Sequence, residues 1–392
     1  MKSKKNILFV SIANDMYGSS KVLLSLVLQI QKQSEDYHPI VCLPMGDGPL
    51  KDIMKAEGIQ IIEMPVVKLT RSMLKSFNFF DLFRDYFKAK KILKKELKGM
   101  EISCVQSNTL ATMFGAFYGV FHKPKHIVHV HEIMDRPKIA SFFFKTVLQL
   151  FSNHVIYNSL ATQDFYNGMS VNIRKKSTLI LNGVDRNESV TSEEQKITIR
   201  KGLFQANNSQ FLTGLIGRIN RLKGHYLLLE AFQEVSKKYP NAKLCFVGSA
   251  PPNQEFYLAN LQDEVQNQGL TEKVSFVDFQ DHIYAVLESL DLVVVPSTEP
   301  ESFGLIVVEA MLSKRAVIGS DIGGISTIID HGETGLLFPP NDKVALVAAI
   351  SELIENDKMK HNMEAKAFQK AEEVYSTAAM YQKFIQLYDR VL

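Results

Sequence analysis

The sequence has few cysteines and no long uninterrupted apolar run, and both shortages exclude classes of protein. Cys42, Cys104 and Cys245 lie far apart and are odd in number. We therefore expect them to be reduced and within strands, which argues for the cytosol and against a disulfide or zinc framework. No segment reaches the roughly 18 apolar residues that a membrane-spanning helix needs, because Lys145 interrupts the nearest candidate, 141–151.

Several enzyme motifs are also missing. Neither turn that opens a βα series has the pattern GxGxxG, which argues against a Rossmann oxidoreductase. No DxD motif follows a predicted strand, and no His/Cys cluster has the spacing of metal ligands. The segment 1–12 has lysines before a short apolar run and no small-residue cleavage site, so we expect a first β-strand rather than a signal peptide.

Strands and helices alternate almost throughout a chain of 392 residues, a length that predicts two domains. The strands are Val/Ile-rich runs, typical of a parallel sheet covered on both faces. A polar stretch at 185–209 separates two βα series, so we expect an N-terminal domain over 1–185 and a C-terminal domain over 186–377. The domain of the last helix, about 378–392, is open, and we expect it to pack back on the first. The expected strands are 7–12, 39–43, 60–63, 103–106, 127–131, 155–158, 178–181, 211–217, 243–247, 274–277, 292–295, 316–319 and 335–338.

A basic turn follows the predicted strand 211–217, in the sequence GRINRLKG. Arg218, Arg221 and Lys223 crowd this turn, which leads into a helix beginning near Gly224. Free backbone N–H groups and the positive dipole end make a helix start a phosphate site. A solvated basic turn is the simpler alternative. The position at the carboxyl end of the first strand of a Rossmann-like unit favours the ligand site.

Two glutamates stand eight residues apart in PSTEPESFGLIVVEAM, after the predicted strand 292–295. Glu309 is the only charge in 303–312, a run that is apolar on every face and therefore typical of a buried helix. A buried carboxylate needs a partner, which is either a core cation in a salt bridge or a ligand such as a ribose diol. Glu301 lies in the preceding loop, where Gly304 permits close approach of a ligand. A further turn, SDIGGIST, either presents backbone amides or starts a helix.

These segments together resemble the retaining glycosyltransferases of family 4, the group 1 glycosyltransferases. The resemblance is close over the second half, through GRINRLKG, FVGSAP, LDLVVVPSTEPESFGLIVVEAM, GSDIGGI and HGETGLLF in the family's order. It is looser in the first half, through MYGSSKVLLSL, HVHEIMDRP, VIYNS and LNGVD. It implies an α/β protein of the GT-B fold, with two tandem Rossmann-like, doubly wound domains that face a central cleft.

The resemblance assigns a role to each matching residue of the second half. Arg218 and Lys223 should hold the diphosphate of a nucleotide sugar. Glu309 should bind the ribose hydroxyls, and Glu301 should contact hydroxyls of the transferred sugar. The backbone amides of 303–304, in Phe303 and Gly304, should lie close to the sugar and the phosphate.

In the first half, the resemblance points to a histidine and a glycine. His131 in HVHE matches the family's histidine near the donor sugar, whereas we expect His129 to point the opposite way along the strand and to remain in the core. Gly18 matches the glycine-rich turn after the first strand, where the acceptor and the phosphate approach, so the resemblance implies that it binds the donor, although Tyr17 stands where the family usually has a second glycine. Asp278 in FVDF also departs from the family, which commonly has glycine there, so the nucleotide is not assigned from it.

The family transfers the sugar with retention and without a metal, because cationic side chains and helix dipoles stabilise the leaving diphosphate. The resemblance therefore implies catalytic roles for His131, Arg218, Lys223 and Glu301, with no metal and no cofactor. It implies a hexose-type sugar on UDP, with GDP as the second choice. The acceptor would be a glycan or lipid-linked molecule in cell-surface polysaccharide or glycolipid biosynthesis.

The window 68–98 is the second informative feature, with ten Lys/Arg against three Asp/Glu and interleaved Phe and Tyr. Lysine pairs are typical of a solvated helix face. Aromatic residues mixed with lysines suit an anionic membrane surface, so we predict such a contact here. The protein would then be cytoplasmic and peripheral on the inner face of the membrane. No nucleic-acid recognition motif accompanies the charge.

Two rival functions keep the same fold. A sugar-nucleotide 2-epimerase would need acid and base carboxylates that reach the sugar from both domains, which the Glu301 and Glu309 pattern does not suit. A non-catalytic sugar-nucleotide-binding protein would not need to retain Arg218, Lys223, Glu301 and Glu309 together.

Overall fold

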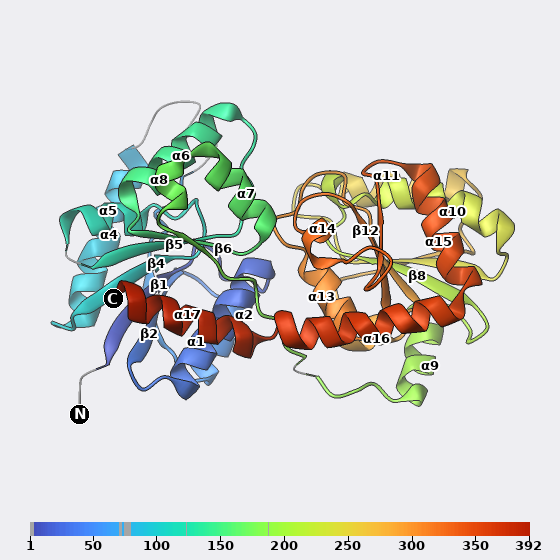
Figure 1. The fold of residues 1–392 in the computed structure, drawn as a ribbon, viewed down its shortest axis with the longest axis horizontal. Helices are drawn as coiled ribbons and strands as arrows, with labels where there is room; N and C mark the ends of the chain where they lie inside the picture. Colours follow the sequence, from blue (N-terminus) through green and yellow to red (C-terminus); the bar gives the residue numbers. More distant parts are fainter. Residues whose placement is uncertain (1–3, 70–72, 74–79, 123, 187) are drawn as a thin grey trace. The chain divides into compact units, whose positions relative to one another are not determined.

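The computed structural model describes residues 4–69, 73, 80–122, 124–186 and 188–392. It divides into two compact units, one of Met1–Gly183 with Ser376–Leu392 and one of Val184–Tyr375, which Figure 1 colours along the chain. The domain boundaries predicted from the sequence lie between residues 185 and 186 and near residue 377. Among the described residues, no helix has both the length and the apolar character needed to cross a membrane.

The first unit is built on a seven-stranded parallel sheet in the order β3-β2-β1-β4-β5-β6-β7. Because helices cover both faces, the strands are apolar throughout rather than alternating. The strand order reverses at β1, so right-handed crossovers place the helices before and after the reversal on opposite faces. The strands are β1 (Lys5–Val10), β2 (Tyr37–Pro44), β3 (Gln60–Met64), β4 (Ile102–Ser107), β5 (Lys125–Val130), β6 (His154–Tyr157) and β7 (Ser177–Leu179).

The helices of the first unit form two groups. One group packs around α1 (Gly18–Gln33), with α2 (Pro49–Ala56) and α17 (Thr377–Val391) in contact with it. The C-terminal helix α17 is tied to the sheet by the Tyr388 hydroxyl, which donates to Gln106 Oε1 at 2.7 Å. The other helices are α4 (Phe80–Leu97), α5 (Phe114–Phe121), α6 (Lys138–Phe151), α7 (Leu160–Met169) and α8 (Val171–Arg174).

The second unit is built on a six-stranded parallel sheet in the order β10-β9-β8-β11-β12-β13. Its strands are β8 (Phe211–Ile216), β9 (Ala242–Val247), β10 (Val274–Val277), β11 (Leu292–Val295), β12 (Ala316–Ser320) and β13 (Leu336–Phe338). A 3-10 turn, η1 (Arg221–Lys223), precedes α10. The helices are α9 (Glu193–Gly202), α10 (His225–Lys238), α11 (Phe256–Asn267), α12 (Ile283–Glu288), α13 (Leu305–Leu312), α14 (Ile325–Ile328), α15 (Lys343–Glu355) and α16 (Asp357–Val374).

The doubly wound α/β organisation predicted from the sequence is confirmed. Every predicted strand is present in the described part of the chain, with ends that differ by up to two residues; the first runs from Lys5 to Val10 rather than over 7–12. Cys42, Cys104 and Cys245 are free and buried in β2, β4 and β9, as expected.

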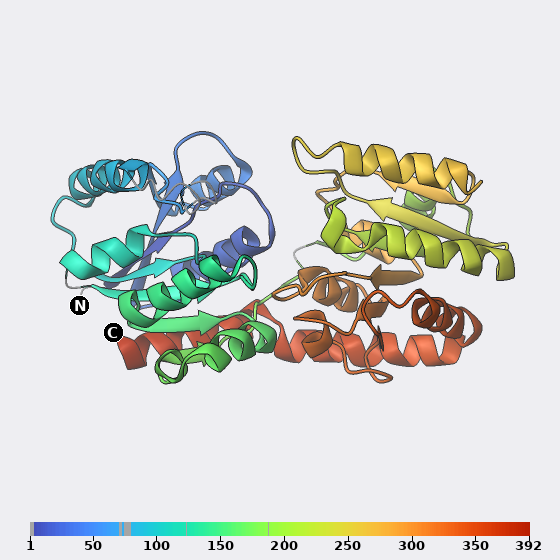
Figure 2. The same cartoon turned by 90° about the horizontal axis from the view of Figure 1, so that it is seen from above.

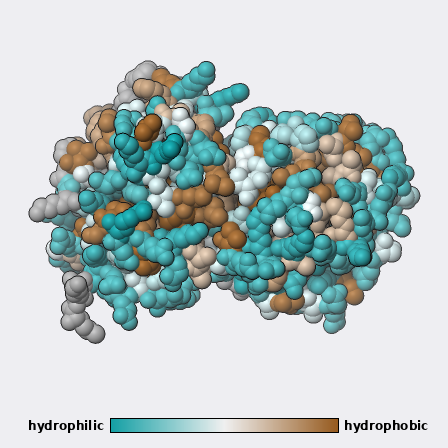
Figure 3. Space-filling model, viewed as in Figure 1, coloured by the Kyte–Doolittle hydropathy of each residue, from teal (hydrophilic) through white to brown (hydrophobic). Residues whose placement is uncertain are grey.

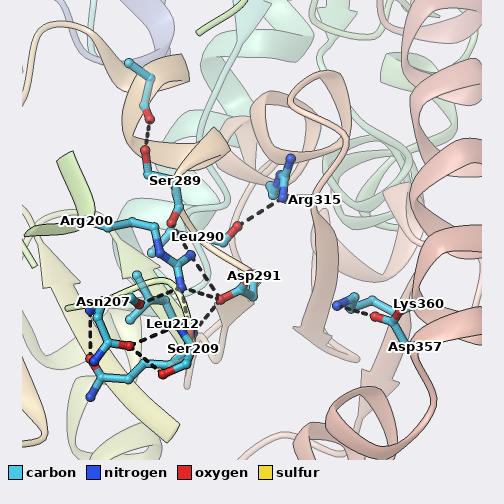
Figure 4. Close-up of polar contacts among 12 residues, drawn as sticks. Arg200, Asn207, Ser209, Leu212, Ser289, Leu290, Asp291, Arg315, Asp357 and Lys360 are labelled. Atoms are coloured by element: carbon cyan, nitrogen blue, oxygen red, sulfur yellow. Dashed lines mark hydrogen bonds and ion pairs between the residues drawn. The ribbon is translucent and has the colours of Figure 1, made fainter. Parts of the chain in front are cut away.

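A buried arginine holds together the amino ends of β8 and β11 (Figure 4). Arg200 of α9 donates from Nη1 to Asp291 Oδ2 at 3.2 Å and to the Ser289 carbonyl at 3.0 Å. The backbone N–H of Leu212 donates to the same Asp291 oxygen at 2.7 Å. The guanidinium and the carboxylate thus pair with each other and with backbone groups at the amino ends of these two strands. In open α/β sheets, ligands bind at the opposite, carboxyl ends of the strands.

Candidate functional site

The carboxyl ends of β8 and β11 are the natural ligand position in the second unit. β8 is the first strand of this sheet, with β9 on one side and β11 on the other. The chain adds β9 and β10 on one side of β8 and β11 to β13 on the other, so the order of the strands reverses between β8 and β11. Ligands of open α/β sheets bind outside the strands at such a point, because the two neighbouring loops diverge there.

The basic turn after β8 is held in place by the side chain of Asn220, within the turn, and by the loop after β11. Asn220 Oδ1 accepts from the backbone N–H of Leu222 at 2.9 Å and of Lys223 at 3.2 Å. The Thr298 N–H, in the loop after β11, donates to the Leu222 carbonyl at 2.9 Å. Gly224 has φ +73°, and a Cβ there would lie 1.9 Å from the Pro296 carbonyl oxygen. The two loops therefore touch backbone to backbone, which only glycine permits.

Lys223 and Glu301 meet across these two loops. Lys223 Nζ lies 2.7 Å from Glu301 Oε1, with the side chains 25% and 19% exposed, and the Ser297 hydroxyl donates to the same oxygen. Burial raises the pKa of the Glu301 carboxyl, but the charge of Lys223 and the two hydrogen bonds outweigh it, and the pKa lies below its ordinary value. Glu301 is therefore an ionised hydrogen-bond acceptor rather than a proton donor at neutral pH.

The other cations of the turn lie at its surface. Arg218 is exposed, two residues after the end of β8. Arg221 forms an ion pair with Glu299 of the neighbouring loop, so its charge is engaged within the protein. Arg218 and Lys223 thus lie on one turn, as the assignment to a diphosphate requires.

A third loop, after β12, closes against the Glu301 segment. The Gly324 N–H donates to the Glu301 carbonyl at 2.7 Å, and a Cβ on Gly324 would lie 2.3 Å from the Phe303 carbonyl oxygen. The Gly324 amide therefore supports the loop. Gly304, at φ +109°, directly precedes α13, and Phe303 is buried beside it. These contacts place the backbone of 301–304 beside the start of α13.

Glu309 lies on α13 and is buried, with 7% of its surface exposed, as the apolar run predicted. The negative charge of Glu309 acts on Tyr284 of α12. Burial is the first cause that raises the pKa of the Tyr284 hydroxyl, and the charge of Glu309 is the second. A ribose diol of a ligand and a group of the protein are the two alternatives for the partner of the Glu309 carboxylate, and they predict different effects of Glu309→Gln on nucleotide binding.

In the first unit, the two candidate residues are Gly18 and His131, and the loops after β4 and β5 lie between them. Gly18 is the first residue of α1, and the Asn108 amide, after β4, donates to the adjacent Ser19 carbonyl at 3.1 Å. Glu132 Oε2 accepts from the backbone N–H of Leu110 at 3.3 Å and of His131 at 3.2 Å. A polar rim therefore runs along the carboxyl edge of this sheet from Gly18 to His131.

The prediction that His129 and His131 point in opposite directions is wrong. The His131 Nε2 and His129 Nδ1 atoms are 3.1 Å apart, and both side chains are buried. Residues two apart in a strand share one face, and His131, one residue past β5, continues that register. Burial lowers the pKa of His131 to about 3, so it is neutral at physiological pH.

Two features of the sites were missed by sequence reasoning. Burial raises the pKa of Glu132 to about 7, although the N–H groups of Leu110 and His131 act against this. His225, one residue after Gly224, is 2% exposed, and neither ring nitrogen has a hydrogen-bond partner among the described residues. A lone acid or histidine gives no pattern, so only tertiary contacts identify such residues.

A cavity of about 280 Å³ lies at the carboxyl ends of β9 and β10. Asp278, which departs from the family pattern, is part of its wall. The lining residues are Gly248, Leu258, Gln262, Phe276, Val277 and Asp278. In the described part of the chain, no group of three or more His, Cys, Asp or Glu is arranged to hold a metal ion.

Comparison with known proteins finds a family match within the second unit. Residues 198–370 match the family model "Glycosyl transferases group 1". The chain is 28% identical over 180 residues to D-inositol 3-phosphate glycosyltransferase of Corynebacterium diphtheriae, covering 42% of each protein. It is 29% identical over 199 residues to N-acetyl-alpha-D-glucosaminyl L-malate synthase of Bacillus anthracis, covering 51% of this chain and 50% of that protein. The match thus spans about half the length of these curated relatives.

Solved structures match the whole chain. The HepE protein of Anabaena, solved in complex with UDP-glucose, covers 98% of this chain and 99% of its own, with a TM-score of 0.83 and 22% identity. A glycosyltransferase from Rickettsia africae covers 99% of this chain and 98% of its own, with a TM-score of 0.82 and 19% identity. At these identities the likeness is one of fold, and it confirms the GT-B class of two parallel-sheet α/β domains.

Proposed function

Residues 198–370 of this chain match the family model of the group 1 glycosyl transferases, and from this premise we propose that the protein is a retaining glycosyltransferase. It moves a hexose-type sugar from a nucleoside-diphosphate sugar to a glycan or a lipid-linked acceptor. The product would belong to a cell-surface polysaccharide or glycolipid.

The convergence of Lys223 and Glu301 at the switch point of the second sheet carries this proposal. The pair combines a fixed cation for a diphosphate with an ionised acceptor for sugar hydroxyls, 2.7 Å apart. Arg218 on the same turn adds a second cation. Backbone contacts among three loops hold the pair in position before any ligand arrives, as electrostatic stabilisation of a leaving group requires.

The ligands of related structures support a nucleotide-sugar donor. HepE of Anabaena was solved with UDP, with UDP and glucose, and with UDP-glucose. By this likeness we favour UDP over GDP, and we propose that the base enters the cavity beside Asp278. With the base in that cavity, the ribose of the donor would lie within reach of the Glu309 carboxylate.

We propose that the reaction proceeds with retention and without a metal. Lys223 and Arg218 would take up the charge that develops on the leaving diphosphate, which is the role a metal ion has in other transferases. A phosphate oxygen of that group would accept the proton of the acceptor hydroxyl. Gly18, on the polar rim of the first unit, would bind the donor at its phosphate, close to the acceptor, and His131, on the same rim, would contact the donor sugar.

A thermal-shift screen with UDP- and GDP-sugars, followed by a transfer assay, tests the proposal. One family of sugar nucleotides should raise the unfolding temperature, and the enzyme should release the nucleoside diphosphate from it in the presence of EDTA. NMR of the product should show the anomeric configuration of the donor. An inverted product would refute retention, and loss of activity in EDTA would refute metal independence.

The product also separates the rival functions. A 2-epimerase would change the sugar at C2 with no transfer to an acceptor, and a binding protein would shift in the thermal screen without forming any product. Lys237, exposed near the end of α10, supplies the matched control. Lys237→Ala should behave like the wild type in every assay, whereas Lys223→Ala should lose the thermal shift with the donor.

A further inference from the structure

Four helices of the first unit, α4, α5, α6 and α8, expose large apolar side chains. On α4, Phe80, Phe83 and Phe87 are between 50% and 72% exposed, and Phe142 on α6 is 68% exposed. Aliphatic side chains on the same helices are also exposed; these are Val120 on α5, Ile139 and Leu150 on α6, and Val171 on α8. Single exposed apolar residues are ordinary, but a large set on adjoining helices marks an interaction surface.

These helices form one continuous surface. The rings of Phe83 on α4 and Phe117 on α5 are stacked, with centroids 5.5 Å apart, and Tyr86 also contacts Phe117. α5 contacts α6, and α6 contacts α8. Figure 2 shows α4, α5 and α6 following one another from cyan to green along the first unit. In Figure 3, hydrophobic atoms stand among hydrophilic ones where α5 and α6 lie in Figure 1.

The charge of this surface is strongly positive. The segment 80–98 has seven Lys/Arg against three Asp/Glu, and two of these acids, Asp81 and Asp85, already pair with Arg84. α6 adds two lysines and no acid, and Arg174 and Lys175 follow at α8. The exposed phenylalanines therefore lie within a field of cations, and the partner must be anionic and able to accept apolar side chains.

We propose that the outer surface of α4, α5, α6 and α8 docks on an anionic lipid bilayer. Phenylalanine side chains enter the boundary between headgroups and acyl chains while lysines meet the headgroups. A second copy of the chain would bring two positive surfaces together, which is unfavourable. The window 68–98, predicted from sequence, supplies only one edge of this surface, and its residues 70–72 and 74–79 lie outside the described residues.

Vesicle sedimentation tests the charge contribution independently of sugar transfer. The wild type should co-sediment with vesicles of 70% phosphatidylcholine and 30% phosphatidylglycerol, and not with phosphatidylcholine alone. Each cation near an anionic surface raises partitioning roughly fivefold, so changing Lys90, Lys91, Lys94 and Lys95 to Gln should lower the partition coefficient at least tenfold. The control removes four exposed lysines elsewhere and should bind like the wild type: Lys201, Lys237, Lys358 and Lys383 changed to Gln.

The apolar contribution needs a second variant. Phe87→Ser with Phe142→Ser should weaken binding at both low and high salt, because apolar insertion is not screened. The matched control changes two equally exposed apolar residues elsewhere, Met45→Ser and Val190→Ser. All variants are first checked for wild-type unfolding temperature and wild-type UDP binding.

Several outcomes would overturn the proposal. These are equal binding to neutral and anionic vesicles, wild-type binding by the quadruple lysine variant, or equal losses in a variant and its control. If the phenylalanine variant instead changes the sedimentation coefficient without lipid, the surface is an interface between copies. Loss of vesicle binding with intact transfer to a water-soluble acceptor would separate this inference from the proposed function.

Discussion

Lys223 and Glu301, from two different loops, form a half-buried ion pair with 2.7 Å between Nζ and Oε1. Neither residue alone defines a site, but the pair presents a cation and an anion side by side at the carboxyl edge of a sheet. A nucleotide sugar offers the complementary pair, a diphosphate next to sugar hydroxyls. Binding of the donor would thus replace the contact between Lys223 and Glu301 by two contacts with the ligand, one from Lys223 to the diphosphate and one from Glu301 to a sugar hydroxyl.

Lys223→Ala should abolish transfer while the fold stays intact. Removing one preorganised group that stabilises developing charge costs roughly two to three orders of magnitude in turnover, and UDP affinity should fall as well. Steady-state assays and calorimetry with UDP measure both, with Lys237→Ala as the control. Wild-type turnover with an authenticated acceptor would show that Lys223 does not act on the leaving group.

Glu301→Gln should separate the nucleotide from the sugar. The amide still accepts a hydrogen bond from Lys223 but no longer neutralises its charge, so UDP without a sugar should bind more tightly. Transfer from the intact donor should fall, because a neutral acceptor binds sugar hydroxyls less strongly. Calorimetry with UDP and a turnover assay decide the point. A parallel loss of UDP affinity would mean that Glu301 chiefly holds the loop.

Glu309→Gln should weaken donor binding if its partner is the ribose. The amide of Gln still accepts a hydrogen bond, but a bond to a charged acceptor is worth about 1 kcal/mol more than one to a neutral acceptor, which predicts a loss of UDP affinity of roughly fivefold. The control compares UDP with pyrophosphate, which lacks a ribose and should bind equally to both proteins. Unchanged UDP affinity, measured by calorimetry, would favour a structural partner within the protein.

Gly224→Ala should destabilise the second unit and reduce donor binding together. A left-handed backbone costs an L-residue about 1–2 kcal/mol, and the new Cβ would press on the Pro296 carbonyl. Thermal unfolding and UDP binding measure the two effects. Gly269→Ala has a similar φ, +67°, with no atom within 4 Å of the new Cβ. This control should lose some stability but retain UDP affinity.

Glu132→Gln should flatten the pH dependence of stability in the acid to neutral range. The folded pKa, about 7, lies above the ordinary value of 4.5, so the folded state holds a proton that the unfolded state releases. Its contribution is present below about pH 4.5 and is lost as the pH rises toward 7. Apparent unfolding temperatures at pH 5 and pH 8 should converge in this variant.

The control for this pH effect is the exposed Glu35→Gln, which should leave the wild-type pH profile unchanged. A wild-type profile in Glu132→Gln as well would show that the carboxyl titrates normally in the folded protein.

Some features were predictable because a local pattern carries them. Runs of valine and isoleucine between helical segments identify parallel strands, and an apolar run around one carboxylate predicted the burial of Glu309. The direction of His129 was predicted wrongly, although the two-residue period of a strand was sufficient to place it beside His131.

The sequence by itself determined the two βα series, the turns at their strand ends and the cations and carboxylates those turns contain. This follows because secondary-structure period and turn chemistry are local. Only the tertiary structure decided that Lys223 pairs with Glu301, that Glu132 is desolvated, and that phenylalanines of separate helices share one surface. Such pairings depend on which strands become neighbours and on how completely water is excluded, and no stretch of sequence contains both partners.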